Sequence, residues 1–275
     1  MAEKLPNYSV LMSVYYKEHS EYLKASIESI WNQTIKTNDF VLVCDGPLND
    51  ELDSVIDDAK STLGEVLHVV RLDKNCGLGE ALNIGIRECK NEIVARMDSD
   101  DIAFPDRCER QLQHMITGDL DIISGSVLEF QGNTENVTGA RRVPVTKSEI
   151  IQFSKKRNPF NHPAIMYQKL SVIEAGGYTE EFHLFEDYHL WIRMLMRDCN
   201  CENLLDPVVY MRTGNDAILR RGGKEYAKDM LRFHRWLKDA GWTSNIDYFT
   251  GAIPHGIVCV IPNSARLWIY RLLRK

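Results

Sequence analysis

Short apolar runs alternate with segments of helical periodicity through the first part of this 275-residue chain. Continuous apolar runs are typical of buried strands, and apolar residues at helical spacing are typical of the helices that cover them. We expect strands at 9–15, 40–44, 66–72 and 92–97, and helices at 22–33, 49–63, 79–89 and from Pro105 onward. This order predicts an α/β fold with a doubly wound, mostly parallel sheet flanked by helices.

The second half of the chain is less regular, but it shows no repeat and no low-complexity linker. We expect one or two strands in 120–130, a surface loop at 132–144, a short strand at 164–167, and helices at 186–196, 225–237 and 264–273. The chain is therefore expected to be one domain, with a main body at 1–212 and a basic loop and helical C-terminal extension at 213–275.

Charge is distributed unevenly along the chain. The net charge of −6 argues against a nucleic-acid-binding protein, for which a basic surface is expected. Residues 203–275 nevertheless contain 12 Lys and Arg against 6 Asp and Glu, a net charge of +6, so residues 1–202 carry −12. A basic C-terminal quarter predicts contact with phosphate groups or with an anionic surface.

Cysteine usage and the apolar stretches bear on the compartment. The seven cysteines form neither a CxxC pair nor a zinc-ligand spacing, which fits a reducing cytosol. The N-terminus has no apolar signal-peptide segment, and the longest apolar stretch, 253–261, is too short to span a bilayer. We expect a cytoplasmic protein that is soluble or peripherally attached to a membrane.

Three carboxylates, Asp98, Asp100 and Asp101, come directly after the apolar run 92–97. Their charges repel one another, and Mn²⁺ or Mg²⁺ would neutralise them while leaving coordination positions for substrate phosphates. Ligands of open α/β sheets bind beyond the carboxyl ends of the strands, where this cluster is expected. The alternative is a solvated acidic loop. An EF-hand calcium loop is unlikely on the pattern, because its Gly and Glu positions are missing.

Six motifs in order give the chain a family resemblance. They are Val14-Tyr15, Asp45-Gly46, the segment from Asn75 to Gly85, Asp98–Asp101, His162-Pro163-Ala164, and Gly176-Gly177-Tyr178 followed by Phe185–Arg193. Together they resemble the family-2 inverting glycosyltransferases, above all the bacterial branch that builds capsule, exopolysaccharide or lipopolysaccharide O-chains. One such motif is weak evidence, whereas six in the right order over most of the chain are strong.

The resemblance implies a GT-A fold, a nucleotide-diphosphate sugar donor and a divalent metal. On the donor side, Asp45 matches the acid that contacts the pyrimidine base, Tyr15 lies in the loop that packs on this base, and Asp98 lies near the ribose. The direct metal ligand corresponds to Asp100, with Asp101 in support.

On the acceptor side, the resemblance identifies Asp187 as the catalytic base, with Glu186 beside it and His162 near the acceptor or the diphosphate. One-step inversion needs a base that takes a proton from the attacking hydroxyl and a cation that holds the departing diphosphate. Without the family context, Asp187 could instead be an acid in a helix's first turn, and His162 a packed loop residue.

Glycine and arginine residues complete the predicted donor site. Asn75 and Gly77 would let the backbone approach the nucleotide, although the same pattern also fits a simple turn before a helix. Arg212 and Arg220 border a Gly-rich stretch that could close over the donor diphosphate, and the alternative is a solvated loop. At 264–275, apolar and basic residues alternate, which predicts contact with an anionic membrane or packing on the protein's own sheet.

These features predict an inverting glycosyltransferase on the inner face of the plasma membrane. It would transfer a hexose or N-acetylhexosamine, from UDP-sugar, to a growing oligosaccharide linked to undecaprenyl lipid. The chain departs from the family pattern at Ser13, Tyr16, Cys44 and Leu82, which weakens any prediction of the donor sugar. Two alternatives remain: an inactive nucleotide-sugar-binding subunit, and a nucleotidyltransferase, whose usual Gly-rich loop after the first strand is absent.

Overall fold

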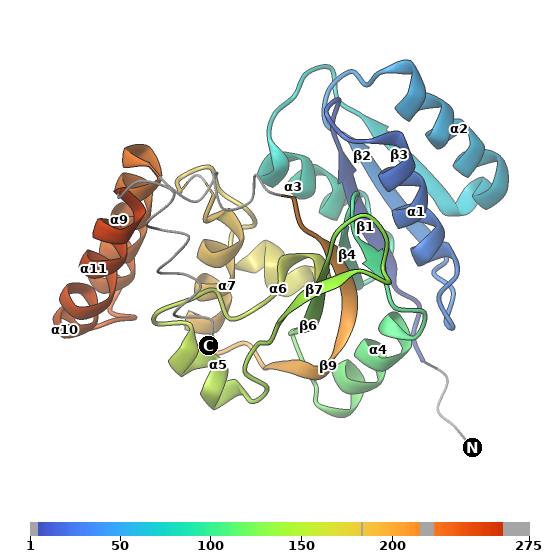
Figure 1. The fold of residues 1–275 in the computed structure, drawn as a ribbon. Helices are drawn as coiled ribbons and strands as arrows, with labels where there is room; N and C mark the ends of the chain where they lie inside the picture. The colour runs from blue at the N-terminus through green and yellow to red at the C-terminus, as the bar shows by residue number, and fades with distance from the viewer. Residues whose placement is uncertain (1–4, 183, 215–222, 261–275) are drawn as a thin grey trace.

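The computed structural model describes residues 5–182, 184–214 and 223–260. Nine strands form one sheet in the order β3-β2-β1-β4-β8-β6-β9-β5, and β7 pairs with β6 (Figure 1). The strands are β1 (Ser9–Val14), β2 (Asp39–Cys44), β3 (Leu67–Arg71), β4 (Ile93–Asp98), β5 (Ile102–Ala103), β6 (Ile122–Phe130), β7 (Val137–Arg141), β8 (Met166–Gln168) and β9 (Cys201–Arg212).

Strand direction divides the sheet into two parts. The β3-β2-β1-β4 part is entirely parallel, as the alternation of strands and helices predicts. Beyond β4 the sheet is mixed, because β8 runs antiparallel to both β4 and β6, while β6 and β9 are parallel to each other. Strands β5 and β7 are antiparallel to their neighbours. The predicted sheet flanked by helices is therefore confirmed as mostly parallel, with antiparallel pairs beyond β4.

Helices cover both faces of the sheet (Figure 1). They are α1 (Ser20–Trp31), α2 (Asp50–Leu63), α3 (Leu78–Glu88), α4 (Arg107–Thr117), α5 (Lys147–Phe153), α6 (Lys169–Glu174), α7 (Glu186–Met196), α9 (Lys224–Asp239), α10 (Asn245–Asp247) and α11 (Ile253–Val260), with the 3₁₀ turns η1 (Gly64–Val66) and η2 (His162–Ala164) and the π-helical η3 (Tyr248–Ala252). Across the described ranges, none of these helices has both the length and the apolar character needed to cross a bilayer.

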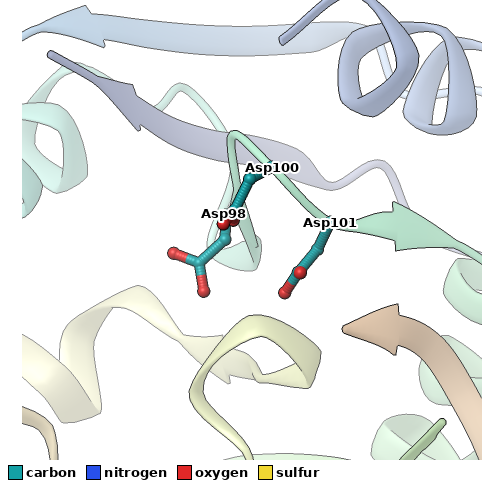
Figure 2. Close-up of side chains that lie close together, drawn as sticks. All are labelled: Asp98, Asp100 and Asp101. Carbon is teal, nitrogen blue, oxygen red and sulfur yellow. The ribbon is translucent and has the colours of Figure 1, made fainter. Parts of the chain in front are cut away.

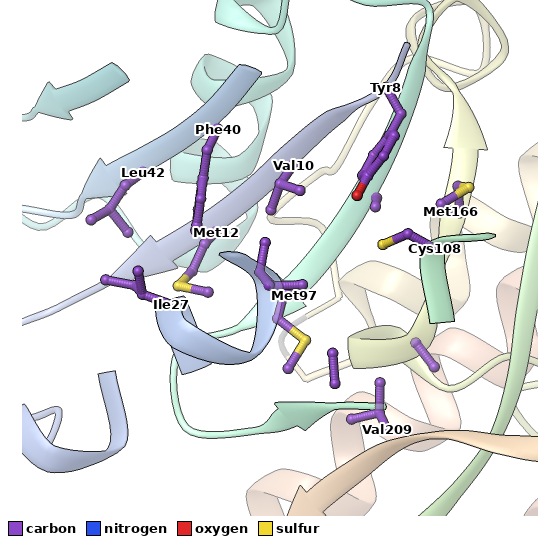
Figure 3. Packing of buried hydrophobic residues seen from close by; sticks show 14 of the residues in the cluster. Tyr8, Val10, Met12, Ile27, Phe40, Leu42, Met97, Cys108, Met166 and Val209 are labelled. Atoms are coloured by element: carbon purple, nitrogen blue, oxygen red, sulfur yellow. The ribbon is translucent and has the colours of Figure 1, made fainter. Parts of the chain in front are cut away.

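Two apolar layers hold the helices against the sheet. Successive side chains of a strand point to opposite faces, so Val10 and Met12 join the layer under α1, α2 and α4 (Figure 3), while Leu11 joins the other layer. That second layer is built mainly from α3 and α7, and it includes Met230 and Phe233 of α9. Helix α9 thus packs on the main body through its apolar face.

The elements predicted for the first part of the chain agree with the structure to within two residues. Asn49 caps α2 as expected, and its side chain accepts a hydrogen bond of 2.9 Å from the backbone N–H of Leu52. The helix expected from Pro105 instead begins at Arg107. The predicted helices 186–196 and 225–237 are present as α7 and α9, and the segment 264–273 lies outside the described residues.

Parts of the second half differ from the prediction. The segment 132–144, expected to be a loop, contains β7, and the 12-residue β9 was not predicted at all. Strand β7 lies largely exposed on the edge of β6, so it has no apolar face to mark it in the sequence. In β9, Asp206 and Pro207 interrupt the apolar pattern where the register with β6 shifts.

Candidate active site

The aspartates Asp98, Asp100 and Asp101 converge where β4 ends and the chain turns into β5. One carboxylate oxygen from each of them lies within 4.8 Å of the others. Figure 2 shows all three side chains on the same turn, with Asp98 and Asp101 directed to the same side of the loop. Because the loop lies at the carboxyl end of a parallel strand, it occupies the edge of the sheet at which ligands are expected.

The environment of these carboxylates favours a bound cation. Burial, together with the negative charges of Asp98 and Glu18, raises the pKa of Asp100 to about 7. Burial and the charges of Asp100 and Asp98 hold the pKa of Asp101 well above its ordinary value. A divalent ion would remove this repulsion, and an all-carboxylate donor set suits Mn²⁺ or Mg²⁺. The residues present therefore fit the metal that the family resemblance implies.

The last residue of β9, Arg212, holds the aspartate loop in place. Its backbone N–H donates to the Asp101 carboxylate at 2.6 Å, and its Nε donates to the Asp100 carbonyl at 2.9 Å. Its guanidinium carbon lies 3.7 Å from the ring centroid of Tyr22 and 4.5 Å from that of Phe130. The side chain predicted to contact the donor diphosphate is thus engaged with the loop that carries the metal ligands.

Asp45 joins the end of β2 to the glycine motif that precedes α3. Its carboxylate accepts hydrogen bonds from the backbone N–H groups of Cys76 at 2.7 Å and Gly77 at 3.1 Å, and the Asn75 side-chain amide donates to its carbonyl at 3.2 Å. Gly46 has a φ of +87°, and a Cβ there would lie 2.6 Å from the backbone nitrogen of Asn75. Three predicted donor-site residues, Asp45, Asn75 and Gly77, therefore form one structural unit.

Of the other predicted donor contacts, Tyr15 lies in the described part of the chain. Tyr15 follows β1 and is 41% exposed, as a residue that packs on a ligand would be. The backbone N–H of Asp45 donates to the Val14 carbonyl at 2.8 Å, which joins the ends of β1 and β2. Arg220 lies outside the described residues.

The predicted base, Asp187, lies in the first turn of α7. One carboxylate oxygen accepts a hydrogen bond of 2.7 Å from the backbone N–H of Tyr188, and the other accepts one of 2.7 Å from the side-chain amide of Asn158. Burial raises the pKa of Asp187, and these two hydrogen bonds oppose the rise. Glu186 precedes it on the same turn and is partly exposed.

His162 lies beside the tyrosine of the double-glycine motif. Its Nε2 is 2.9 Å from the Tyr178 hydroxyl oxygen. Burial and the charge of Arg96 hold the pKa of His162 well below its usual value, so the imidazole is neutral. The backbone of Tyr178 is bound to α3, because its N–H donates to the Asn83 side chain at 2.8 Å and its carbonyl accepts from the same side chain at 2.8 Å.

Two polar residues of the site were not predicted. Arg96 lies two residues before Asp98 on β4, and its guanidinium donates to the Asp98 carboxylate. A charged residue within an apolar strand is a signal that the sequence does contain. Asn158 is 29 residues from Asp187, and only tertiary packing brings the two together. The charge of Arg96 also acts on Asp101 and Asp187, so the predicted metal ligands and the predicted base both feel the same buried charge.

Comparison with known proteins agrees with this geometry. The family model described as Glycosyl transferase family 2 matches residues 9–177. The UDP-Gal:alpha-D-GlcNAc-diphosphoundecaprenol beta-1,3-galactosyltransferase of Escherichia coli is 36% identical over 272 residues, covering 98% of each chain. The amylovoran biosynthesis glycosyltransferase AmsE of Erwinia amylovora is 37% identical over 246 residues, covering 88% of this chain and 91% of that protein.

Solved structures show the same fold at lower sequence similarity. The structure of residues 1–349 of S. aureus TarS, in complex with UDP-GlcNAc, superposes with a TM-score of 0.63 at 17% identity. The match covers 82% of this chain and 65% of that one. With a family model that spans more than half of its length and relatives similar over nearly all of it, the chain belongs to glycosyltransferase family 2 and is a glycosyltransferase.

Proposed function

We propose that this protein is an inverting, metal-dependent galactosyltransferase of surface-polysaccharide biosynthesis. The observation that carries the proposal is the presence of two separate acidic centres, one at the end of β4 and one in the first turn of α7. The cluster of Asp98, Asp100 and Asp101 suits a metal-bound diphosphate, and the separate carboxylate of Asp187 suits a base. The sugar and the acceptor are proposed from the E. coli relative, which is similar over its whole length and whose name specifies UDP-Gal and a GlcNAc-diphosphoundecaprenol.

The donor would bind along the carboxyl edge of β1, β2 and β4, in a GT-A arrangement. Asp45, with Asn75 and Gly77 bound to it, would contact the uracil, and Tyr15 would pack on the base. Asp98 would lie near the ribose. Asp100 and Asp101 would hold Mn²⁺ or Mg²⁺, which when bound supplies positive charge to the departing diphosphate.

Asp187 would take the proton from the acceptor hydroxyl as this oxygen forms the new glycosidic bond. The hydrogen bonds from Asn158 and from the Tyr188 N–H leave the carboxylate fixed in one orientation. Glu186 and the neutral His162 are the remaining groups that would contact the acceptor. A single displacement of this kind inverts the anomeric configuration.

The arginines of the second half would have different roles. Arg212 would position the metal-binding loop, since its N–H groups and its ring contacts already hold that loop. Arg220, which lies outside the described residues, would contact the donor diphosphate. Residues 1–212 would then be the nucleotide-sugar-binding and catalytic part, and 213–275 an extension of the same domain.

A lipid-linked acceptor requires the enzyme to work at a membrane, and we propose peripheral attachment to the cytoplasmic face. The run from α10 through α11 exposes Ile246 at 72%, Phe249 at 66% and Val260 at 50%. No acidic, Lys or Arg residue lies between Asp247 and Arg266 in the sequence. A helical run with exposed aromatic and aliphatic side chains and few charges suits the bilayer interface. The basic segment 264–275 would add attraction to anionic lipid.

Two other functions would use the same sheet. An inactive sugar-nucleotide-binding subunit would bind the donor without turnover, and a nucleotidyltransferase would release pyrophosphate instead of UDP. The fixed orientation of Asp187, separate from the metal ligands, favours the glycosyltransferase, because neither alternative needs a base at that position.

The proposal is tested by incubating the purified full chain with Mn²⁺, a GlcNAc-diphosphate-lipid acceptor, and UDP-Gal, UDP-Glc, UDP-GlcNAc or UDP-GalNAc in turn. We expect UDP-Gal to give UDP and a product whose new linkage is β by NMR, because the bond in the donor is α. A product with an α linkage would contradict the inverting mechanism. Transfer only from a donor other than UDP-Gal would contradict the assignment as a galactosyltransferase.

A further inference from the structure

Arg96 is a buried cation on β4 with unused hydrogen-bonding capacity. Its side chain is 1% exposed, and one terminal nitrogen donates to the Asp98 carboxylate. Its Nε and its Nη1 have no hydrogen-bond partner among the residues that the structure describes. An arginine stays charged in a protein and its N–H groups are costly to leave unpaired, so packing alone does not account for this residue here.

The charge of Arg96 acts on three buried side chains of a neighbouring aromatic cluster, Tyr167, Tyr178 and His162. The hydroxyl of Tyr167 and the indole nitrogen of Trp191 are also buried without a partner in the described parts of the chain, and their ring centroids lie 6.5 Å apart. Trp191 also contacts His162 and Tyr178, with ring centroids at 6.0 and 6.1 Å. Ordered internal water is the usual partner of such sealed polar atoms. Arg96 therefore pairs with Asp98 beside a buried aromatic cluster that has unused hydrogen-bonding capacity of its own.

Carboxylates face Arg96 from two elements. Asp98, Asp100 and Asp101 lie on the β4–β5 turn, and Asp187 lies on α7. The charge of Arg96 also acts on Tyr178, Tyr167 and His162. A second buried cation, Arg107, donates from Nη2 to the Arg96 carbonyl at 2.6 Å, but it is the Arg96 side chain that pairs with a carboxylate of the cluster. The donor and acceptor halves of the site meet at Arg96.

We propose that Arg96 is a positioning residue for the donor site, and that it acts through Asp98. The hydrogen bond from its terminal nitrogen fixes the Asp98 carboxylate in the orientation that binds the nucleotide sugar, and its charge offsets the repulsion among the acids before a cation arrives. The guanidinium is sealed from solvent, so it acts on the substrate only through Asp98. This inference rests on the proposed function.

A double-mutant cycle separates this role from a general effect on folding. The variants are Arg96→Met, Asp98→Asn and both together, with Arg197→Met as the matched control, since Arg197 is a surface arginine paired with Glu174. Calorimetry gives the Kd of UDP with Mn²⁺, kinetics gives kcat and KM for the donor, and urea unfolding gives stability. We expect each single variant to weaken UDP binding by about tenfold or more, and the double variant to be no weaker than the poorer single one.

A fourth variant, Arg96→Lys, keeps the charge but lacks the planar fork. It should fold even if Arg96→Met does not, and it should recover only part of the UDP affinity. Any of three results would overturn the inference. The losses of UDP affinity in the single variants could multiply in the double variant. Arg96→Met could fold and bind UDP as the wild type does, or Arg96→Lys could recover the full UDP affinity. If the wild-type protein binds no nucleotide, the proposed function is wrong, and Arg96 has no role in donor binding. The free energies of unfolding in urea for the same four proteins still show whether Arg96 and Asp98 are energetically coupled.

Discussion

At the scale of single residues, the site depends on charges that are held apart and oriented. Asp187 was predictable because it belongs to a motif, but its partner Asn158 was not, because nothing local in the sequence links the two. Asp100 and Asp101 were predictable as neighbours after a strand. The high pKa values that burial gives them depend on the folded surroundings.

Asn158→Ala should lower kcat about tenfold or more and shift its pH dependence. A general base works in its ionised form, so activity is lost as the pH falls through the raised pKa of Asp187. The amide of Asn158 opposes that rise, and its removal should move the acidic limb of the kcat profile to higher pH. Glu186 and Arg96, which also act on Asp187, remain in place. Asn136→Ala, in an exposed loop, is the control, and an unshifted acidic limb would count against this role.

Manganese affinity should rise as the pH increases from 6 to 8. The pKa of Asp100 is about 7 and that of Asp101 is well above its ordinary value, so protons must leave before a cation can bind. Titration calorimetry in two buffers of different ionisation enthalpy should show proton release at pH 6. Affinity that is constant across this range would show that the acids are already ionised.

At the scale of elements, the sequence predicts those whose signals are local. The parallel strands β1, β2 and β4 are continuous apolar runs, and α2 has both a capping Asn49 and an apolar stripe. Strand β9 escaped prediction because it is defined by pairing with β6, and Pro207 lies where that pairing shifts register. Yet β9 carries Arg212, which holds the metal loop, so a functional contact depends on an element without a local signal.

Gly46→Ala should disrupt the turn that joins β2 to the glycine motif. The position needs a positive φ, and the added Cβ would meet the backbone of Asn75 at 2.6 Å. We expect a loss of roughly 1–3 kcal/mol in the free energy of unfolding and weaker UDP binding, because Asp45 and Asn75 must move apart. Gly64→Ala is the control, since it has a φ of +56° but open space around it. Equal losses in both variants, with UDP binding intact, would mean that the close approach is unimportant.

At the scale of the whole molecule, the alternation of strands and helices predicted the fold class, and the position of Asp98–Asp101 after a strand predicted a candidate site at the carboxyl edge of the sheet. Neither signal predicted that the sheet beyond β4 would be mixed, since β8 and β9 find their places through contacts between distant segments. The exposed side chains of Ile246 and Phe249 also belong to this scale, because exposure is a property of the assembled surface.

Ile246→Asp combined with Phe249→Asp should reduce sedimentation with vesicles that contain anionic lipid by several-fold, because two apolar contacts with the interface are lost. Activity on a water-soluble acceptor should be unchanged. Leu205→Asp, which alters another side chain that is 64% exposed, is the matched control. If the control reduces vesicle binding as much as the double variant does, the α10–α11 face is not the membrane surface.

The separation of metal ligands from base is best examined by comparing UDP binding with turnover in Asp187→Asn and Asp100→Asn. Asp187→Asn should bind UDP with Mn²⁺ as the wild type does, while its turnover falls by about a thousandfold. Asp100→Asn should lose the part of UDP binding that EDTA abolishes in the wild type. Normal turnover in Asp187→Asn, or Mn²⁺-dependent binding that survives in Asp100→Asn, would show that these two residues do not have the roles assigned to them.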